Sequence, residues 1–226
     1  MTTTREPRGH ARTVHLVVAG ITLAALVLQL CLTVSGAATL LPEARPSLAT
    51  RLVQFLSYFT ILSNILVLYS EGSLARDPER DGPAWRVLRL NALTCITITA
   101  MVHWFLLRPL LDLQGASYLA DKLLHVVVPL LMLVAWLVAG PRGKVTRLEL
   151  APSLILPAAW LAWTLLAGAV RSWYPYPFVD VDLHGYAVVA LNCAGVALLL
   201  LALSALALWA DGRLTARADA RAVRAG

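Results

Sequence analysis

Charged residues are scarce in this sequence. They make up 14% of the 226 residues, whereas soluble domains carry about 25%. Hydrophobic residues make up 59% of the chain, and its mean hydropathy is +0.72. The few charges lie in short segments between long apolar runs, which is typical of chains that cross a membrane. This pattern excludes an ordinary soluble domain and predicts an all-α integral membrane protein.

Cysteines are also few, and all three, Cys31, Cys95 and Cys193, lie inside apolar runs. They are too dispersed for a disulfide framework or a zinc site, so we interpret them as small core residues. Acidic residues number 13 against 19 basic ones. The basic residues flank apolar spans and form no separate basic domain, which excludes a nucleic-acid partner. We expect no metal and no cofactor.

Six apolar segments are long enough to cross a bilayer, which takes about 20 residues at about 1.5 Å each. The predicted spans are about 14–36, 48–70, 87–107, 118–139, 150–170 and 185–210. The first is longer than the apolar region of a secretory signal and has no clear cleavage site after it, so we expect it to be retained. The whole chain, 1–226, is predicted to be a single polytopic helix bundle.

The basic residues divide unequally between the two sides of this bundle. Fourteen of the 19 lie on the side of the two termini, and five lie on the other side. Because cytoplasmic loops carry the excess of Lys and Arg, both termini are predicted to be cytoplasmic, in a multi-pass protein of the cell membrane. The last external loop, 172–185, is rich in Trp, Tyr and Pro. We expect it to fold over the outer mouth of the bundle.

Function must be sought among the polar residues of the spans, because such groups are costly in lipid. Ser57, Thr60 and Asn64 follow one another at intervals of three and four residues, so they are predicted to share one face of the second span. His125 lies in the fourth span, four residues before Pro129, which removes a backbone hydrogen bond and favours a kink there. Helix rise alone leaves open whether Thr60 and His125 touch.

Each of these residues also has a purely structural interpretation. A buried Thr usually bonds the carbonyl one turn back or joins helices, and a buried His can do the same. His103 lies near the predicted end of the third span, beside Trp104 and Arg108. An interfacial anchor is therefore the favoured interpretation of His103. Asp121 also lies near an interface, where it can be solvated or paired.

Three segments resemble one known family: FTILSN in the second span, DKLLHVVVP in the fourth and YPYPFVDV before the last. This family of six-span membrane proteins contains the androgen-induced and androgen-dependent membrane proteins of animals and a largely uncharacterised bacterial branch. The animal members are threonine hydrolases that cleave fatty acid esters of hydroxy fatty acids within the membrane. The resemblance implies a lipid-ester substrate for this chain.

The resemblance also implies catalytic roles for two residues, Thr60 as the nucleophile and His125 as the general base. A threonine hydroxyl needs an adjacent base, which a neutral imidazole supplies. The oxyanion would need hydrogen-bond donors, for which Asn64, Ser57 and His103 are candidates. The surroundings of His125, with Asp121 and Lys122 just upstream, differ from the animal motif, so the activity need not transfer.

Two other classes of function remain open. The polar stripes could line a pocket for a small or lipidic ligand in a non-enzymatic binding or transport protein. Against a pump, the spans lack several buried carboxylates. The polar residues could also serve only to join helices in an assembly protein. Among enzymes, the sequence has no GxSxG nucleophile elbow, so the Thr and His pair is the catalytic hypothesis.

Overall fold

The computed structural model describes residues 6–37 and 46–225, and this part of the chain is helical without any strand. Its α-helices are α1 (Glu6–Ser35), α2 (Leu48–Ser57), α3 (Phe59–Arg76), α4 (Pro83–Val102), α5 (Gly115–Lys122), α6 (Val128–Ala139), α7 (Ile155–Arg171) and α8 (Val181–Ala225). Short 3₁₀ segments are η2 (Arg108–Leu110), η4 (Arg147–Glu149), η5 (Pro152–Leu154) and η6 (Pro177–Val179), and π-helical segments are η1 (His103–Leu107) and η3 (Leu123–Val127).

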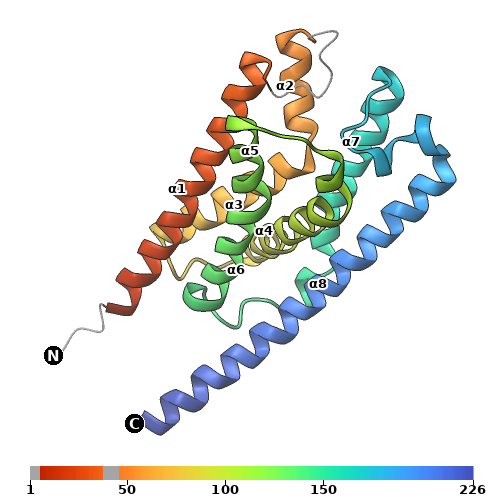
Figure 1. Cartoon of the computed structure of the whole chain (residues 1–226). Helices are drawn as coiled ribbons and strands as arrows, with labels where there is room; N and C mark the ends of the chain where they lie inside the picture. The colour runs from red at the N-terminus through yellow and green to blue at the C-terminus, as the bar shows by residue number, and fades with distance from the viewer. Residues whose placement is uncertain (1–5, 38–45, 226) are drawn as a thin grey trace.

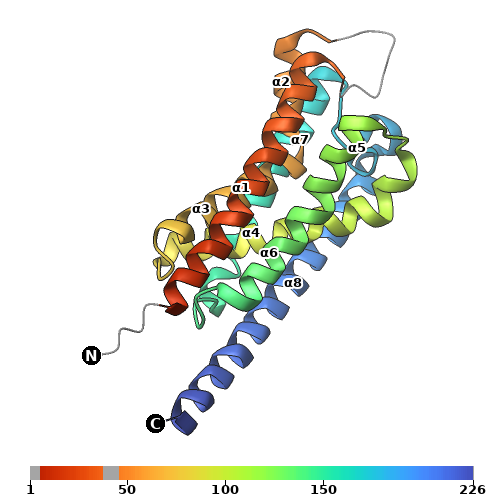
Figure 2. The ribbon, with the colours of Figure 1, turned by 60° about the vertical axis from the view of Figure 1, so that its left-hand side comes forward.

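The helices are long and apolar enough for a membrane bundle. Within the described residues, five of them meet this criterion: Gly9–Ser35, Pro83–Leu110, Gly115–Ala139, Arg147–Arg171 and Val181–Ala220. Together, α2 and α3 meet it as a sixth unit, but they are bent by 67°. The all-α membrane bundle predicted from composition is therefore confirmed. Helix α1 begins and α8 ends at the same end of the bundle (Figures 1 and 2).

The break between α2 and α3 is the largest departure from the predicted spans. Tyr58 has an extended backbone, with φ −71° and ψ 126°, so the region predicted as one helix, 48–70, is two. The prediction that Ser57, Thr60 and Asn64 share one helical face is therefore wrong for Ser57, which lies before the break. Thr60 and Asn64 both lie on α3 after it.

Backbone groups left free by the break are bonded by side chains from distant segments. The indole N–H of Trp160, on α7, donates to the carbonyl of Ser57 at 2.8 Å. The backbone N–H of Thr60 donates to the hydroxyl of Tyr176 at 3.2 Å. Since lipid offers no partner for an open backbone group, these two bonds stabilise the bent pair inside the bundle. They also fix Thr60 in the first turn of α3.

Two π-helical turns each precede a proline. The turn η3 contains His125 and ends two residues before Pro129, and η1 begins at His103 and ends two residues before Pro109. Proline has no N–H to continue the regular ladder, so the preceding turn widens. The distortion predicted at His125 is confirmed in this form, and a second one occurs at His103.

A buried charged cluster joins four helices at the end of the bundle where α1 begins. Nδ1 of His15 lies 2.7 Å from Oε2 of Glu71, and Nη1 of Arg89 lies 3.8 Å from Oε1 of the same carboxylate. Nε2 of His15 also bonds the carbonyl of Ala139, 3.2 Å away at the end of α6. The three charged or ionisable side chains are at most 5% exposed. This cluster therefore ties α1, α3, α4 and α6 together.

Candidate active site

Thr60 and His125 are in contact. The hydroxyl oxygen of Thr60 lies 3.1 Å from Nε2 of His125, although 65 residues separate them in the chain. Thr60 is buried in the first turn of α3, and His125 reaches it from the π-helical turn η3. Helices from two separate regions of the sequence thus bring together a hydroxyl and an imidazole at hydrogen-bonding distance.

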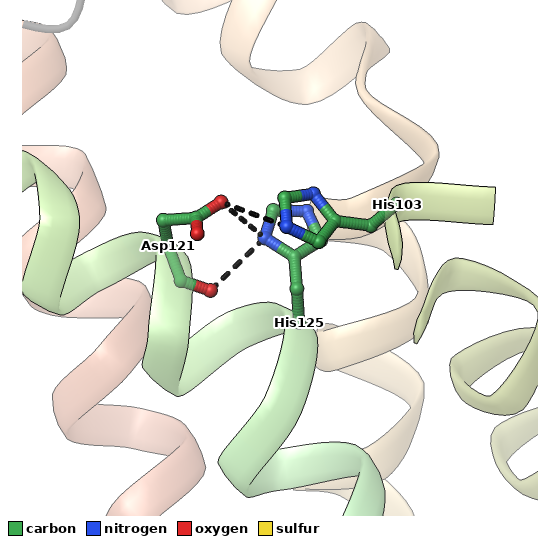
Figure 3. Close-up of side chains that lie close together, drawn as sticks. All are labelled: His103, Asp121 and His125. Carbon is green, nitrogen blue, oxygen red and sulfur yellow. Dashed lines mark hydrogen bonds and ion pairs between the residues drawn. The ribbon is translucent and has the colours of Figure 1, made fainter. Parts of the chain in front are cut away.

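Asp121 orients the imidazole of His125 from one turn away. Nδ1 of His125 lies 3.0 Å from the Asp121 carboxylate and 3.0 Å from its backbone carbonyl (Figure 3). Both of these partners are acceptors, so Nδ1 carries the proton and Nε2 is left to accept from Thr60. The order of groups is hydroxyl, imidazole, carboxylate, which is the arrangement of a catalytic triad.

The surroundings of Asp121 are more buried than the sequence indicates. Its carboxylate is 7% exposed and also pairs with Nζ of Lys122 at 2.9 Å. The sequence predicted Asp121 as a solvated or paired residue near an interface. Its bond to His125 was not predicted. The signal available was its spacing of four residues before His125 on a predicted helix.

His103 stacks on His125. The ring centroids are 3.9 Å apart and the planes differ by 14°, while Nε2 of His103 lies 3.4 Å from Oδ1 of Asp121 (Figure 3). His103 is only 1% exposed, so the favoured interpretation of this residue as an interfacial anchor is wrong. The π-helical turn η1 directs its ring inward, where it packs against the ring of His125.

The same three residues include metal-ligating groups. One ligand atom each from His103, Asp121 and His125 lie within 4.8 Å of one another. Two imidazoles and a carboxylate suit Zn²⁺ or Fe²⁺. However, an imidazole binds a metal in its ring plane, and two stacked rings direct their lone pairs side by side. One ring would have to turn before both could bind the same ion. The observed arrangement therefore favours a chain of hydrogen bonds, from Thr60 through His125 to Asp121, which is called the relay below.

The donor groups of Asn64 and Ser57, the two other polar residues predicted near Thr60, are already hydrogen-bonded. Nδ2 of Asn64 donates to the carbonyls of Thr60 at 2.8 Å and Leu124 at 3.3 Å. The hydroxyl of Ser57 donates to the carbonyl of Val53 at 2.8 Å. Neither side chain therefore has a free donor for an oxyanion. Asn64 instead links α3 to η3 and so holds Thr60 opposite His125.

Tyr176, which was not among the donor candidates taken from the sequence, brings a second hydroxyl close to Thr60. Its hydroxyl lies 3.3 Å from the Thr60 hydroxyl and accepts the Thr60 N–H. Burial raises the pKa of Tyr176 to about 12, so the phenol stays protonated and can donate. The loop that was expected to fold over the bundle contains this residue, but no pattern in the sequence indicated which of its aromatic rings would turn inward.

Thr60 also opens into an apolar cavity of about 310 Å³. Side chains from α3, α4, α7 and α8 line this cavity, among them Phe59, Ile98, Leu161 and Leu200. Tyr176 closes one side of it. Pockets of this size are at the lower end of those that hold small ligands. Thr60 and Tyr176 therefore lie on the wall of an apolar cavity, with His125 and Asp121 behind them.

Comparisons of this chain with protein-family models, with curated proteins and with solved structures found no significant match.

Proposed function

We propose that this protein is an intramembrane acyl hydrolase that cleaves lipid esters through an acyl-threonine intermediate. One observation carries the proposal: the Thr60 hydroxyl, 3.1 Å from His125 Nε2, lies on the wall of an apolar cavity large enough for part of an acyl chain. Membership of the androgen-induced and androgen-dependent family is proposed on its three short segments, and it assigns the same two residues.

In the first step, His125 takes the proton of Thr60 while the threonine oxygen attacks the ester carbonyl. Asp121 keeps His125 in the tautomer that can accept this proton and stabilises the imidazolium that forms. His125 then returns the proton to the leaving alcohol. In the second step, His125 takes a proton from a water molecule, whose oxygen bonds to the acyl carbon; the bond from this carbon to the Thr60 oxygen breaks, and that oxygen takes the proton from His125 as the acid leaves.

The tetrahedral intermediate needs donors near Thr60, and two features can provide them. The Tyr176 hydroxyl, 3.3 Å from the nucleophile, can donate to the oxyanion. Thr60 also lies in the first turn of α3, where the helix dipole is positive and favours developing negative charge. Both features depend on the break at Tyr58, because in a continuous helix the Thr60 amide would bond within the helix and no helix would begin there.

The position in the cell is part of the same proposal. We propose that the bent pair α2 and α3 forms one span, which gives six spans with both termini in the cytoplasm of a plasma-membrane protein. The excess of basic residues on the side of the termini supports this orientation. So does the placement of the start of α1 and the end of α8 at one end of the bundle (Figure 2).

A fluorophosphonate probe, which reacts with activated hydroxyl groups, tests the proposal. Membranes containing the wild-type protein should be labelled, and labelling should be lost in Thr60→Ala and His125→Ala. The matched controls are Thr97→Ala, whose hydroxyl donates to the carbonyl of Leu93, and the exposed His184→Ala. Both controls should label normally.

Peptide mass spectrometry should then locate the phosphonyl group on Thr60. Undiminished labelling of Thr60→Ala, or an adduct on another residue, would contradict the proposed nucleophile. Folded wild-type protein that does not react would favour the second candidate function, a non-enzymatic binding protein for an apolar ligand. The cavity beside Thr60, almost entirely apolar in its lining, is the observation that favours this alternative.

A further inference from the structure

We infer that the acyl group held on Thr60 is passed to amphiphilic alcohols in preference to water, so that the protein acts as a lipid transacylase as well as a hydrolase. The inference rests on the proposed function, since it requires an acyl-threonine. The group that attacks this intermediate must enter the apolar cavity, so the cavity lining decides which groups are held there.

The cavity provides almost nothing to hold a water molecule. Its lining is apolar except for a few groups, and most of these are already bonded. The Thr99 hydroxyl is bonded to that of Ser63 at 2.9 Å, and the Trp160 indole donates to Ser57. A buried water needs two to four polar partners, and apolar cavities remain dry. Apart from the reacting Thr60, Tyr176 is the main remaining polar contact, and it is needed by the oxyanion.

An alcohol with an alkyl chain does not depend on such polar partners. Its chain can lie along the apolar walls, which orient its hydroxyl toward His125. Transfer from lipid to the cavity brings little hydrophobic gain, because lipid tails are as apolar as the walls. The advantage over water therefore comes from orientation and from the high concentration of such alcohols in the bilayer.

The site must also admit such an alcohol if it releases one. In cleaving a lipid ester, the leaving alcohol departs from a position next to His125 Nε2. By microscopic reversibility, another alcohol of the same kind can enter that position and react in the opposite direction. Because α7 and α8 line one side of the cavity and make few contacts with each other in the described part of the chain, we expect lipids to enter between them.

The transfer step balances without any further reagent. His125 Nε2 takes the proton of the acceptor hydroxyl, and the acceptor oxygen bonds to the acyl carbon. The bond between this carbon and the Thr60 oxygen then breaks, and that oxygen takes the proton back from His125. The products are a new ester and the free Thr60 hydroxyl, with no change in oxidation state.

The test uses the full-length protein in bilayer discs, with p-nitrophenyl decanoate as donor and 1-dodecanol as acceptor at increasing mole fractions in the bilayer. Release of p-nitrophenol measures acylation, decanoic acid measures hydrolysis and dodecyl decanoate measures transfer. We expect ester to exceed acid and the ratio of ester to acid to rise with the mole fraction of dodecanol. Both products should be lost in Thr60→Ala.

A second variant tests directly whether the apolar lining of the cavity disfavours water. Val102→Thr adds a hydroxyl to the cavity lining at nearly constant volume, so it should raise the share of acid while acylation continues. The control is Val134→Thr on α6, which is 52% exposed on the outside of the bundle; its product ratio should match that of the wild type.

The outcomes separate the two proposals. Thr60-dependent release of p-nitrophenol with decanoic acid as the sole product at every dodecanol level would overturn the transacylase and leave the hydrolase intact. Absence of any Thr60-dependent release would overturn the proposed function, and the transacylase with it. An ester-to-acid ratio that is the same in Val102→Thr and the wild type would contradict the idea that the apolar lining of the cavity sets the ratio of ester to acid.

Discussion

The hydroxyl of Tyr176 accepts a hydrogen bond from the backbone N–H of Thr60 at 3.2 Å, across 116 residues of chain. This bond completes the first turn of α3 and brings a phenol to the hydroxyl that faces His125. The loop between α7 and α8 is thus part of the candidate site, and its removal would leave both an unpaired amide and an incomplete donor set.

Tyr176→Phe should therefore lower kcat with little change in KM. Loss of a single oxyanion donor slows comparable enzymes by about 10²- to 10³-fold, and the ring itself remains to fill its buried position. The measurement is steady-state hydrolysis of an activated ester by the purified variant. Tyr174→Phe, on the same loop, is the matched control. A rise in KM at unchanged kcat would indicate that the phenol binds substrate and does not stabilise the oxyanion.

Asp121→Asn tests the orientation of His125. The variant keeps the backbone carbonyl that also accepts from Nδ1 but replaces the carboxylate with an amide. We expect acylation to slow by about 10²-fold or more, because the imidazolium loses its counter-charge. The readout is the rate of fluorophosphonate labelling against pH. The exposed Asp182→Asn should react as the wild type does. An unaltered profile in Asp121→Asn would show that the backbone carbonyl alone orients the base.

Apolar length predicted the kind of fold, for a physical reason. Helix rise left open whether Thr60 and His125 touch, and the resemblance selected this pair, which lies in contact. The break at Tyr58 could not be predicted, because it is stabilised by Trp160 and Tyr176, which lie more than a hundred residues away. The inward direction of the His103 ring depends likewise on the π-helical turn η1, and the burial of Asp121 on α5 depends on packing against distant residues such as His103.

The state of Tyr176 gives a prediction about pH. Its folded pKa is raised to about 12 by burial, against 10.0 for the free side chain. The protonated phenol is therefore the form that the fold favours, and its contribution to stability is complete below about pH 10 and is lost between about pH 10 and 12. The tyrosinate absorbance of the wild type minus that of Tyr176→Phe should rise at about pH 12. A difference curve centred near pH 10 would contradict the buried hydroxyl.

Chelation distinguishes the relay from a metal site at His103, Asp121 and His125. Because the stacked rings do not direct their lone pairs to one point, we expect fluorophosphonate labelling to be unchanged after prolonged exposure to EDTA and 1,10-phenanthroline. Total metal in the purified protein, measured by plasma mass spectrometry, should be well below one ion per chain. Loss of labelling on chelation, restored by a single divalent metal, would replace the relay with a metal-assisted mechanism.

The buried cluster around Glu71 should be essential for stability but should not affect the reactivity of Thr60. Glu71→Ala removes the carboxylate that faces both His15 and Arg89 and leaves a buried guanidinium without its partner. Breaking a buried ion pair in this way costs about 3–5 kcal/mol of unfolding free energy. The measurement is reversible unfolding in mixed micelles, with the exposed Asp219→Ala as control. The fraction that remains folded should still label at Thr60, since the cluster joins α1, α3, α4 and α6 at a distance from Thr60 and His125. Equal stability of Glu71→Ala and the wild type would mean that water or lipid headgroups solvate Arg89 as well as the carboxylate does, and that the helices are held by apolar packing alone.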